Sequence, residues 1–134
     1  MYFAALNALN AFKSRNNVSN SVAMETLLYA SAQRQIKEAL ELIGIKPGTQ
    51  HVAVLIMSQT QKQADGVLRT VSQLLGDKLD DSVLALTDDK TDGIRKMFEI
   101  SDAELEAKLQ REGLEKQTLM DMVLEHMALL VTQR

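Results

Sequence analysis

The sequence predicts an α/β fold, in which a small central β-sheet is packed with helices. Two short apolar segments predict strands, and five or six segments with apolar residues at helical spacing predict helices. The first strand is expected from His51 to Ser58, because the unbroken apolar run Val52–Met57 is typical of a strand buried on both faces. The second is expected over residues 82–86. Alternation of helical and strand patterns in one short chain therefore favours this fold class.

Three helices are predicted before residue 45. Apolar residues at helical spacing open the chain: Tyr2, Ala5, Leu6, Leu9 and Phe12. A polar loop, Ser14–Ser21, follows, and Asn20 or Ser21 is expected to cap a nearly all-apolar helix over residues 22–30. The third helix buries one face, made of Ile36, Ala39, Leu40 and Ile43, and ends at Gly44.

The strongest amphipathic pattern lies between the two predicted strands. Thr60 and Gln63 are spaced as a capping box. The apolar stripe behind them consists of Ala64, Val67, Leu68, Val71, Leu74 and Leu75, and Gly76 ends the helix. Leu68 lies in the middle of this stripe, so we expect it in the core.

The rest of the chain predicts three more helices and a terminal strand. Asp88 or Asp89 is expected to cap a helix that carries Ile94, Met97 and Phe98. Ser101 and Glu104 form a second capping box before a charged helix that reaches Arg111 and ends at Gly113. The last helix is expected over residues 118–127, and residues 128–132 as a strand. Because a sheet of two or three strands is marginal, we expect either that a further segment of this chain completes the sheet or that a strand-bearing segment is missing.

Composition limits the function. The 134 residues suit one domain, 46% of them are hydrophobic, and the absence of cysteine suits a reducing cytoplasm. No apolar run approaches the length of a membrane span. The net charge of −3 argues against bulk electrostatic binding of nucleic acid. The charge is uneven, however, because residues 1–50 carry five Lys or Arg against three acids, and the remainder ten against fifteen. Two different partners, or chance, would explain this equally well.

No catalytic, metal or cofactor site is expected. His51 and His126 lie far apart in sequence at no metal-binding spacing, and no phosphate-binding glycine motif is present. The adjacent acids Asp80 and Asp81 are more typical of a solvated turn than of acid–base chemistry. Glu25, near the start of an apolar helix, either interacts with the helix dipole or orients a partner or a neighbouring arginine. We therefore predict a binding protein and no enzyme.

Two blocks of sequence resemble a known family. The first runs from Asn20 to Leu40 and continues to Ile43-Gly44, and the second comprises residues 76–84 and 94–100, with the predicted strand His51–Ser58 between the blocks. Both are similar to the kinase-binding subunit of the KEOPS complex, the TPRKB-like family, in an archaeal version. The resemblance covers roughly residues 1–100 and the final helix. It implies a single domain over residues 1–134.

The resemblance implies a non-catalytic role. KEOPS installs threonylcarbamoyl on the adenosine next to the anticodon of certain tRNAs, and this subunit docks on the small atypical kinase/ATPase, supports its activity and, in archaeal members, helps recruit tRNA through its 3′ CCA end. We expect tRNA at the helix entries, where the candidates are Lys13, Arg15, Asn20, Ser21, Arg34 and Gln35. We expect the kinase at Met97 and on the last helix, at Leu119, Val123 and Met127.

Two departures from the family pattern stand out. The chain begins almost at the first helix, so it looks N-terminally short, and residues 101–117 look like an insertion. We also expect a cytoplasmic location, no membrane partner and a capacity for self-association. A protein–protein adaptor without an RNA role is the alternative function, and the negative net charge favours it.

Overall fold

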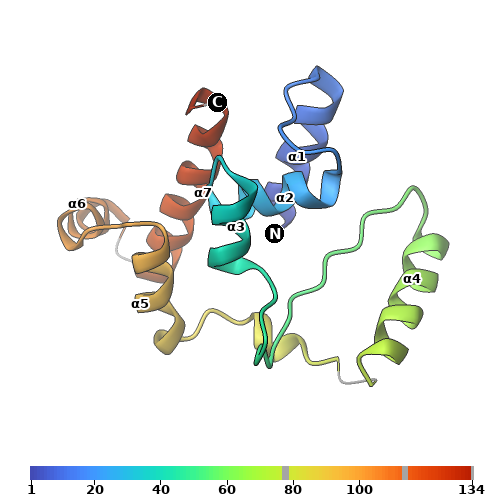
Figure 1. Ribbon diagram of the computed structural model, residues 1–134. Helices are drawn as coiled ribbons and strands as arrows, with labels where there is room; N and C mark the ends of the chain where they lie inside the picture. Colours follow the sequence, from blue (N-terminus) through green and yellow to red (C-terminus); the bar gives the residue numbers. More distant parts are fainter. Residues whose placement is uncertain (77–78, 113–114, 134) are drawn as a thin grey trace. The chain divides into compact units, whose positions relative to one another are not determined.

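The computed structural model describes residues 1–76, 79–112 and 115–133, apart from the side chains of residues 110–112, and its regular secondary structure is entirely helical (Figure 1). The elements in chain order are α1 (Tyr2–Ser14), α2 (Val22–Ser31), α3 (Ile36–Ile43), α4 (Gln61–Leu74), the 3₁₀ helix η1 (Asp81–Leu84), α5 (Asp88–Met97), α6 (Asp102–Glu112) and α7 (Glu115–Gln133). The described residues contain no strand. The predicted α/β fold with a central sheet is therefore wrong for this structure.

Each predicted strand fails for a different reason. His51–Ser58 is extended but belongs to no ladder among the described residues, and an extended chain becomes a strand only by pairing. The second predicted strand instead forms η1, because Asp80 Oδ1 accepts the backbone N–H of Ser82 at 3.0 Å and tightens the turn. Residues 128–132 continue α7. Apolar runs this short do not distinguish a strand from a helix by periodicity.

The chain divides into two compact units. The first unit is Met1–Pro47 with Leu86–Arg134, and the second unit is Gly48–Ala85. The first contains α1 to α3 and α5 to α7, and the second contains the extended segment, α4 and η1.

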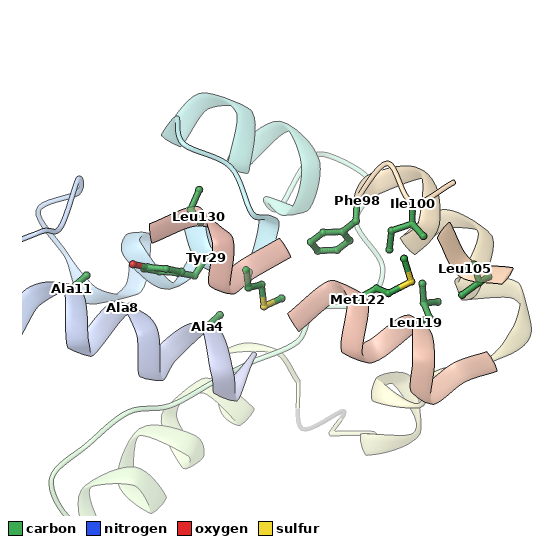
Figure 2. Packing of buried hydrophobic residues seen from close by; sticks show 12 residues of the cluster. Ala4, Ala8, Ala11, Tyr29, Phe98, Ile100, Leu105, Leu119, Met122 and Leu130 are labelled. Carbon is green, nitrogen blue, oxygen red and sulfur yellow. The ribbon is translucent and has the colours of Figure 1, made fainter. Parts of the chain in front are cut away.

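The core lies in the first unit and is organised along α7. Helix α7 contacts α1, α2, α5 and α6. Figure 2 shows Leu130 beside Tyr29 and the alanines of α1, and Leu119 and Met122 beside Phe98 and Ile100. Leu28, Leu119 and Leu130 are at most 2% exposed. One long helix thus joins the N-terminal helices to the α5–α6 region.

Helix α1 turns a different face inward from the one predicted. Its buried residues are Ala4, Ala5, Ala8 and Ala11, whereas Tyr2 is 79% exposed and Leu6 45%. Small alanine side chains let the α1 backbone pack closely against α2, which a face of large residues would prevent. The predicted helix is confirmed, but of the five apolar residues at helical spacing that predicted it, only Ala5 is buried.

The helix boundaries follow the predicted capping residues. Ser21 Oγ accepts the backbone N–H of Met24 at 3.1 Å, and Thr60 Oγ1 accepts that of Gln63 at 3.3 Å. Ser101 and Glu104 form the full reciprocal box. Helix α5 is capped at Thr87, one residue before the predicted acids. Gly113 lies outside the described residues.

The second unit has no core of its own. None of its described residues is buried. Leu68 is 39% exposed and Val67 47% exposed, so the α4 stripe does not have the buried position predicted for it.

Candidate functional site

A polar cleft of about 540 Å³ lies in the first unit, between α1, α2 and α7. Seven residues line it: Asn7, Asn10, Ala11, Ser14, Asn16, Tyr29 and Val131. Five of these side chains carry a carboxamide or hydroxyl group, and none carries a charge. Its volume falls within the range of ligand pockets, roughly 300–1,000 Å³. The lining suits a neutral, polar ligand that makes several hydrogen bonds.

The cleft wall is built by a polar stripe on α1. Asn7, Asn10 and Ser14 are spaced by three and four residues and therefore share one side of the helix. Asn7 Nδ2 donates to the carbonyl of Phe3 at 2.8 Å, and Ser14 Oγ donates to that of Asn10 at 2.9 Å. These local bonds orient the side chains. The spacing was readable in the sequence, but the cleft was not predicted.

The loop after α1 is held by a buried carboxylate. Arg15 takes the left-handed conformation, with φ at 59°, and Asn16 donates its backbone N–H to Ala11 at 2.9 Å. Glu25, which is fully buried in α2, accepts the backbone N–H groups of Val18 and Ser19 through Oε2 at 3.1 and 2.9 Å. The sequence left open whether Glu25 interacts with the helix dipole or orients a partner or an arginine. The structure adds a third role, because the carboxylate anchors the loop that precedes its own helix.

The turn between α2 and α3 brings a cation to the end of α7. Ala32 ends α2 in the left-handed conformation, and its N–H bonds the carbonyl of Tyr29 at 3.1 Å. Arg34 Nη1 donates to the carbonyl of Gln133 at 3.4 Å. Since Val131 lines the cleft two residues earlier, Arg34 is placed near the α7 side of the cleft.

All six predicted tRNA-binding residues are exposed: Lys13, Arg15, Asn20, Ser21, Arg34 and Gln35. Lys13 and Arg15 flank Ser14 in the chain, and Ser14 and Asn16 line the cleft. None of the six lines the cleft itself; Lys13 and Arg15 are chain neighbours of lining residues, and Arg34 contacts the carbonyl of Gln133 near the end of α7. Ser21 also caps α2, so its hydroxyl oxygen is already engaged. Their assignment to RNA stays a prediction.

The four predicted kinase-binding residues lie at or next to the core. Leu119 and Met127 are 2% and 6% exposed and belong to the core cluster, and Met97 and Val123 are half-buried against it. The exposed apolar residues of α7 are others, namely Met120, Leu124, Leu129 and Val131. Residues that fill a core are not available to a partner, so Met120 and Leu124, which lie one turn apart on the same side of the helix, are the better candidates.

The remaining titratable groups have structural roles. The ring of His126 packs edge-on against Phe98, with centroids 6.1 Å apart. Hydrogen bonds from the side chain and the backbone of Ser82 lower the pKa of Asp80. Across the described ranges, no group of three His, Asp or Glu residues is placed to hold a metal ion. None of the helices in these ranges is long and apolar enough to cross a membrane.

A second cavity, of about 340 Å³, lies where α5 meets α6. Arg95 and Lys96 line it together with Asp92, Glu99 and Asp102, so acids outnumber bases. Arg95 forms an ion pair with Asp102 across this junction. The excess of acids makes this cavity poorly suited to an anion.

Comparison with known proteins decides the family. The sequence model described as "Kinase binding protein CGI-121" matches residues 1–130. The chain belongs to this family. It is also 37% identical, over 95 residues, to "Regulatory protein Cgi121" of Methanocaldococcus jannaschii. The family match spans residues of both units and includes every residue that lines the cleft except Val131, and it confirms the resemblance that the two sequence blocks carry.

The aligned region is partial in both CGI-121 family chains. It covers 71% of this chain and spans about 60% of the length of the curated archaeal relative. No solved structure matches the chain significantly.

Proposed function

We propose that this chain is a non-catalytic regulatory subunit that binds the small atypical kinase/ATPase of a KEOPS complex and helps to recruit tRNA by its 3′ CCA end. The family match over residues 1–130 carries the kinase half of the proposal. The polar lining of the cleft supports the RNA half. A cytoplasmic location, where tRNA modification takes place, follows from the same proposal.

The chemistry of the cleft suits a single-stranded RNA end. Carboxamide and hydroxyl groups bond the exposed edges of unstacked bases, and an aromatic ring such as that of Tyr29 offers a face for stacking. We propose that Lys13, Arg15 and Arg34, which are all exposed, contact the phosphates. Because the whole chain carries a net charge of −3, such contacts must be local.

A filter-binding titration with tRNA tests the RNA half. The double variant Arg15→Ala/Arg34→Ala removes two cations, so the slope of log K against log salt should fall by about 1.4, at roughly 0.7 per contact with a single strand. The control Lys62→Ala/Arg69→Ala removes the same charge from α4 and should change nothing. Removal of the CCA should weaken binding of the unsubstituted chain. An unchanged slope in the cleft variant would exclude this site.

The exposed side of α7 is the proposed kinase surface. Met120 is 48% exposed and Leu124 37% exposed, and they lie one turn apart on the same side of the helix. Methionine adapts to irregular partner surfaces. Helix α7 is fixed by its contacts with α1, α2, α5 and α6, so this side is presented on a rigid element.

Calorimetric titration of the purified kinase tests this surface. Met120→Asp should weaken binding at least about tenfold, because a charge is placed in an apolar contact. Leu129→Asp is the control on the same helix, since Leu129 is 52% exposed and therefore similarly placed in solvent. If the two variants bind the kinase with equal affinity, Met120 does not belong to the kinase surface.

The alternative is a protein–protein adaptor with no RNA role. The net charge of −3 favours it. The tRNA titration separates the two functions. An adaptor still binds the kinase, but any tRNA binding it shows depends neither on the CCA nor on Arg15 and Arg34.

A further inference from the structure

The hydrogen bonds within α1 determine which polar groups of the cleft wall can still bond a ligand. Ser14 Oγ lies 2.9 Å from the carbonyl oxygen of Asn10 and 3.2 Å from that of Ala11. A carbonyl can only accept, and a hydroxyl has a single hydrogen, so the hydrogen of Ser14 is used within the helix. Towards a ligand, Ser14 therefore acts only as an acceptor.

Asn7 is biased in the same direction. Its Nδ2 donates to the carbonyl of Phe3 at 2.8 Å, which fixes the orientation of the carboxamide. Asn7 and Ser14 together keep about four acceptor lone pairs against a single N–H hydrogen. Asn10, which lies between them on the stripe, brings donors and acceptors in equal number. The α1 wall of the cleft is thus rich in acceptors.

The charge of the cleft distinguishes a neutral donor from a cation. All seven described residues that line it are uncharged. An ammonium or guanidinium group would lose hydration there without a carboxylate to compensate for it. Lys13 and Arg15, on either side of Ser14 in the chain, repel a cation as well. The ligand group that fits is therefore a neutral N–H donor, such as an amino group on an aromatic ring.

Nucleobases differ in this group. Cytosine carries an amino donor at N4 and adenine at N6, whereas guanine has the acceptor O6, and thymine or uracil the acceptor O4, at the corresponding position. A base acceptor that faces Asn7 Oδ1 or Ser14 Oγ leaves both groups unpaired, which costs more than the absence of one contact. The acceptor-rich wall therefore favours cytosine and adenine over uracil and guanine.

The stripe is long enough to meet more than one base. Asn7 and Ser14 lie two turns apart on α1, which is about 10 Å along the helix axis. Successive nucleotides of a stacked strand rise by roughly 3.4 Å. The preference for amino-bearing bases therefore applies to consecutive bases of a single strand.

We propose that the α1 wall of the cleft selects single-stranded ends whose bases carry this amino group, with Asn7 and Ser14 as the specificity-determining residues. The inference rests on the proposed binding of the 3′ CCA end, whose three bases all belong to this class. Replacing CCA by UUG exchanges the amino group of each base for a carbonyl and keeps each ring system. This exchange isolates the chemistry of the base edge from its size.

Filter binding of the full chain to three tRNAs tests the preference: one ends in CCA, one ends in UUG, and one lacks the three terminal nucleotides. The CCA end should bind at least about tenfold more tightly than UUG, because unpaired acceptors are costly. Equal affinity for CCA and UUG, with weaker binding of the shortened tRNA, would overturn the preference and leave the proposed RNA site intact. Equal affinity for all three would exclude both.

Variants of the two residues assign the preference to α1. Asn7→Ala and Ser14→Ala each remove an acceptor, so the ratio of the affinities for CCA and UUG should fall at least about threefold in each. A purely structural effect would weaken both RNAs alike and leave the ratio unchanged. Thr70→Ala is the control, because Thr70 Oγ1 makes the same kind of local bond, to the carbonyl of Gly66 at 3.2 Å on α4. A constant ratio in both cleft variants, or an equal fall in the control, would contradict the proposal.

Discussion

The two units of the chain handle apolar residues in opposite ways. The first unit buries Leu28, Leu119 and Leu130 almost completely, whereas ten large apolar side chains of the second are at least 36% exposed. The strongest amphipathic pattern in the sequence, the stripe of α4, lies in the second unit. The difference shows that a pattern supplies an apolar face, but a core forms only where a second face from elsewhere in the chain meets it.

The largest expected contrast comes from one substitution made in each unit. Leu119→Asp should unfold the first unit, since burying an unpaired carboxylate costs about 4 kcal/mol or more. Leu68→Asp, at a site 39% exposed, should change the free energy of unfolding by less than about 1 kcal/mol. Urea denaturation of dilute protein, followed by circular dichroism, measures both. Comparable losses would show that α4 is packed after all.

Glu25→Ala should give the next largest effect. It leaves the N–H groups of Val18 and Ser19 without their acceptor, and bonds to a charged group contribute about 1.5–3 kcal/mol each. We therefore expect a loss of about 2–3 kcal/mol in urea denaturation and weaker tRNA binding, because the loop beside Arg15 loosens. The control Glu38→Ala, on the exposed side of α3, should stay within about 0.5 kcal/mol.

Glu99→Gly should stabilise the first unit slightly. Glu99 follows α5 with φ at 54°, a conformation that glycine adopts without strain. We expect a gain of about 0.5–1 kcal/mol, read from the thermal midpoint. Lys96→Gly, inside the same helix, should instead cost up to about 1 kcal/mol. A loss at both positions would contradict the left-handed conformation of Glu99.

The smallest contrast is between two exposed carboxylates, one in each unit. Hydrogen bonds from the backbone and side chain of Ser101 lower the pKa of Glu104 below its ordinary 4.5, and bonds from Ser82 lower that of Asp80 below 3.8. Each set of hydrogen bonds therefore stabilises the fold fully at a pH above the ordinary pKa of its carboxylate. This stabilisation is lost as the pH falls through the lowered pKa. In rising urea, NMR titration should show the pKa of Asp80 returning to its ordinary value before that of Glu104. The reverse order would place the weaker packing in the first unit.

The sequence predicted helices better than it predicted what they bury. Caps at Ser21, Thr60 and Ser101 were correct because a cap depends on residues three positions apart. The inward face of α1 was wrong, since close packing of Ala4 and Ala8 depends on α2 and α7. The predicted strands failed because pairing is a long-range property, which an apolar run does not contain.

The candidate site was predicted in part. The candidate tRNA-binding residues were chosen because helix entries offer backbone N–H groups beside polar side chains, and their assignment stays a prediction. The carboxamides of Asn7 and Asn10 were missed, since asparagine inside an apolar helix resembles an interruption of the core face until a cleft is seen beside it. On α7, Met127 was predicted to contact the kinase but lies in the core, whereas Met120 is exposed. Only their burial in the structure distinguishes these two methionines.

Hydrogen exchange of the dilute chain, with and without tRNA that carries an intact 3′ end, tests the assignment of core and site to the first unit most directly. The amides of α2 and α7 should exchange slowest and those of residues 48–76 fastest, because only the first unit has a core. Added tRNA should protect residues 13–21 and 33–36 and leave residues 48–76 unchanged. Protection by tRNA confined to residues 48–76, or slow exchange of α4 in the dilute chain, would contradict the account.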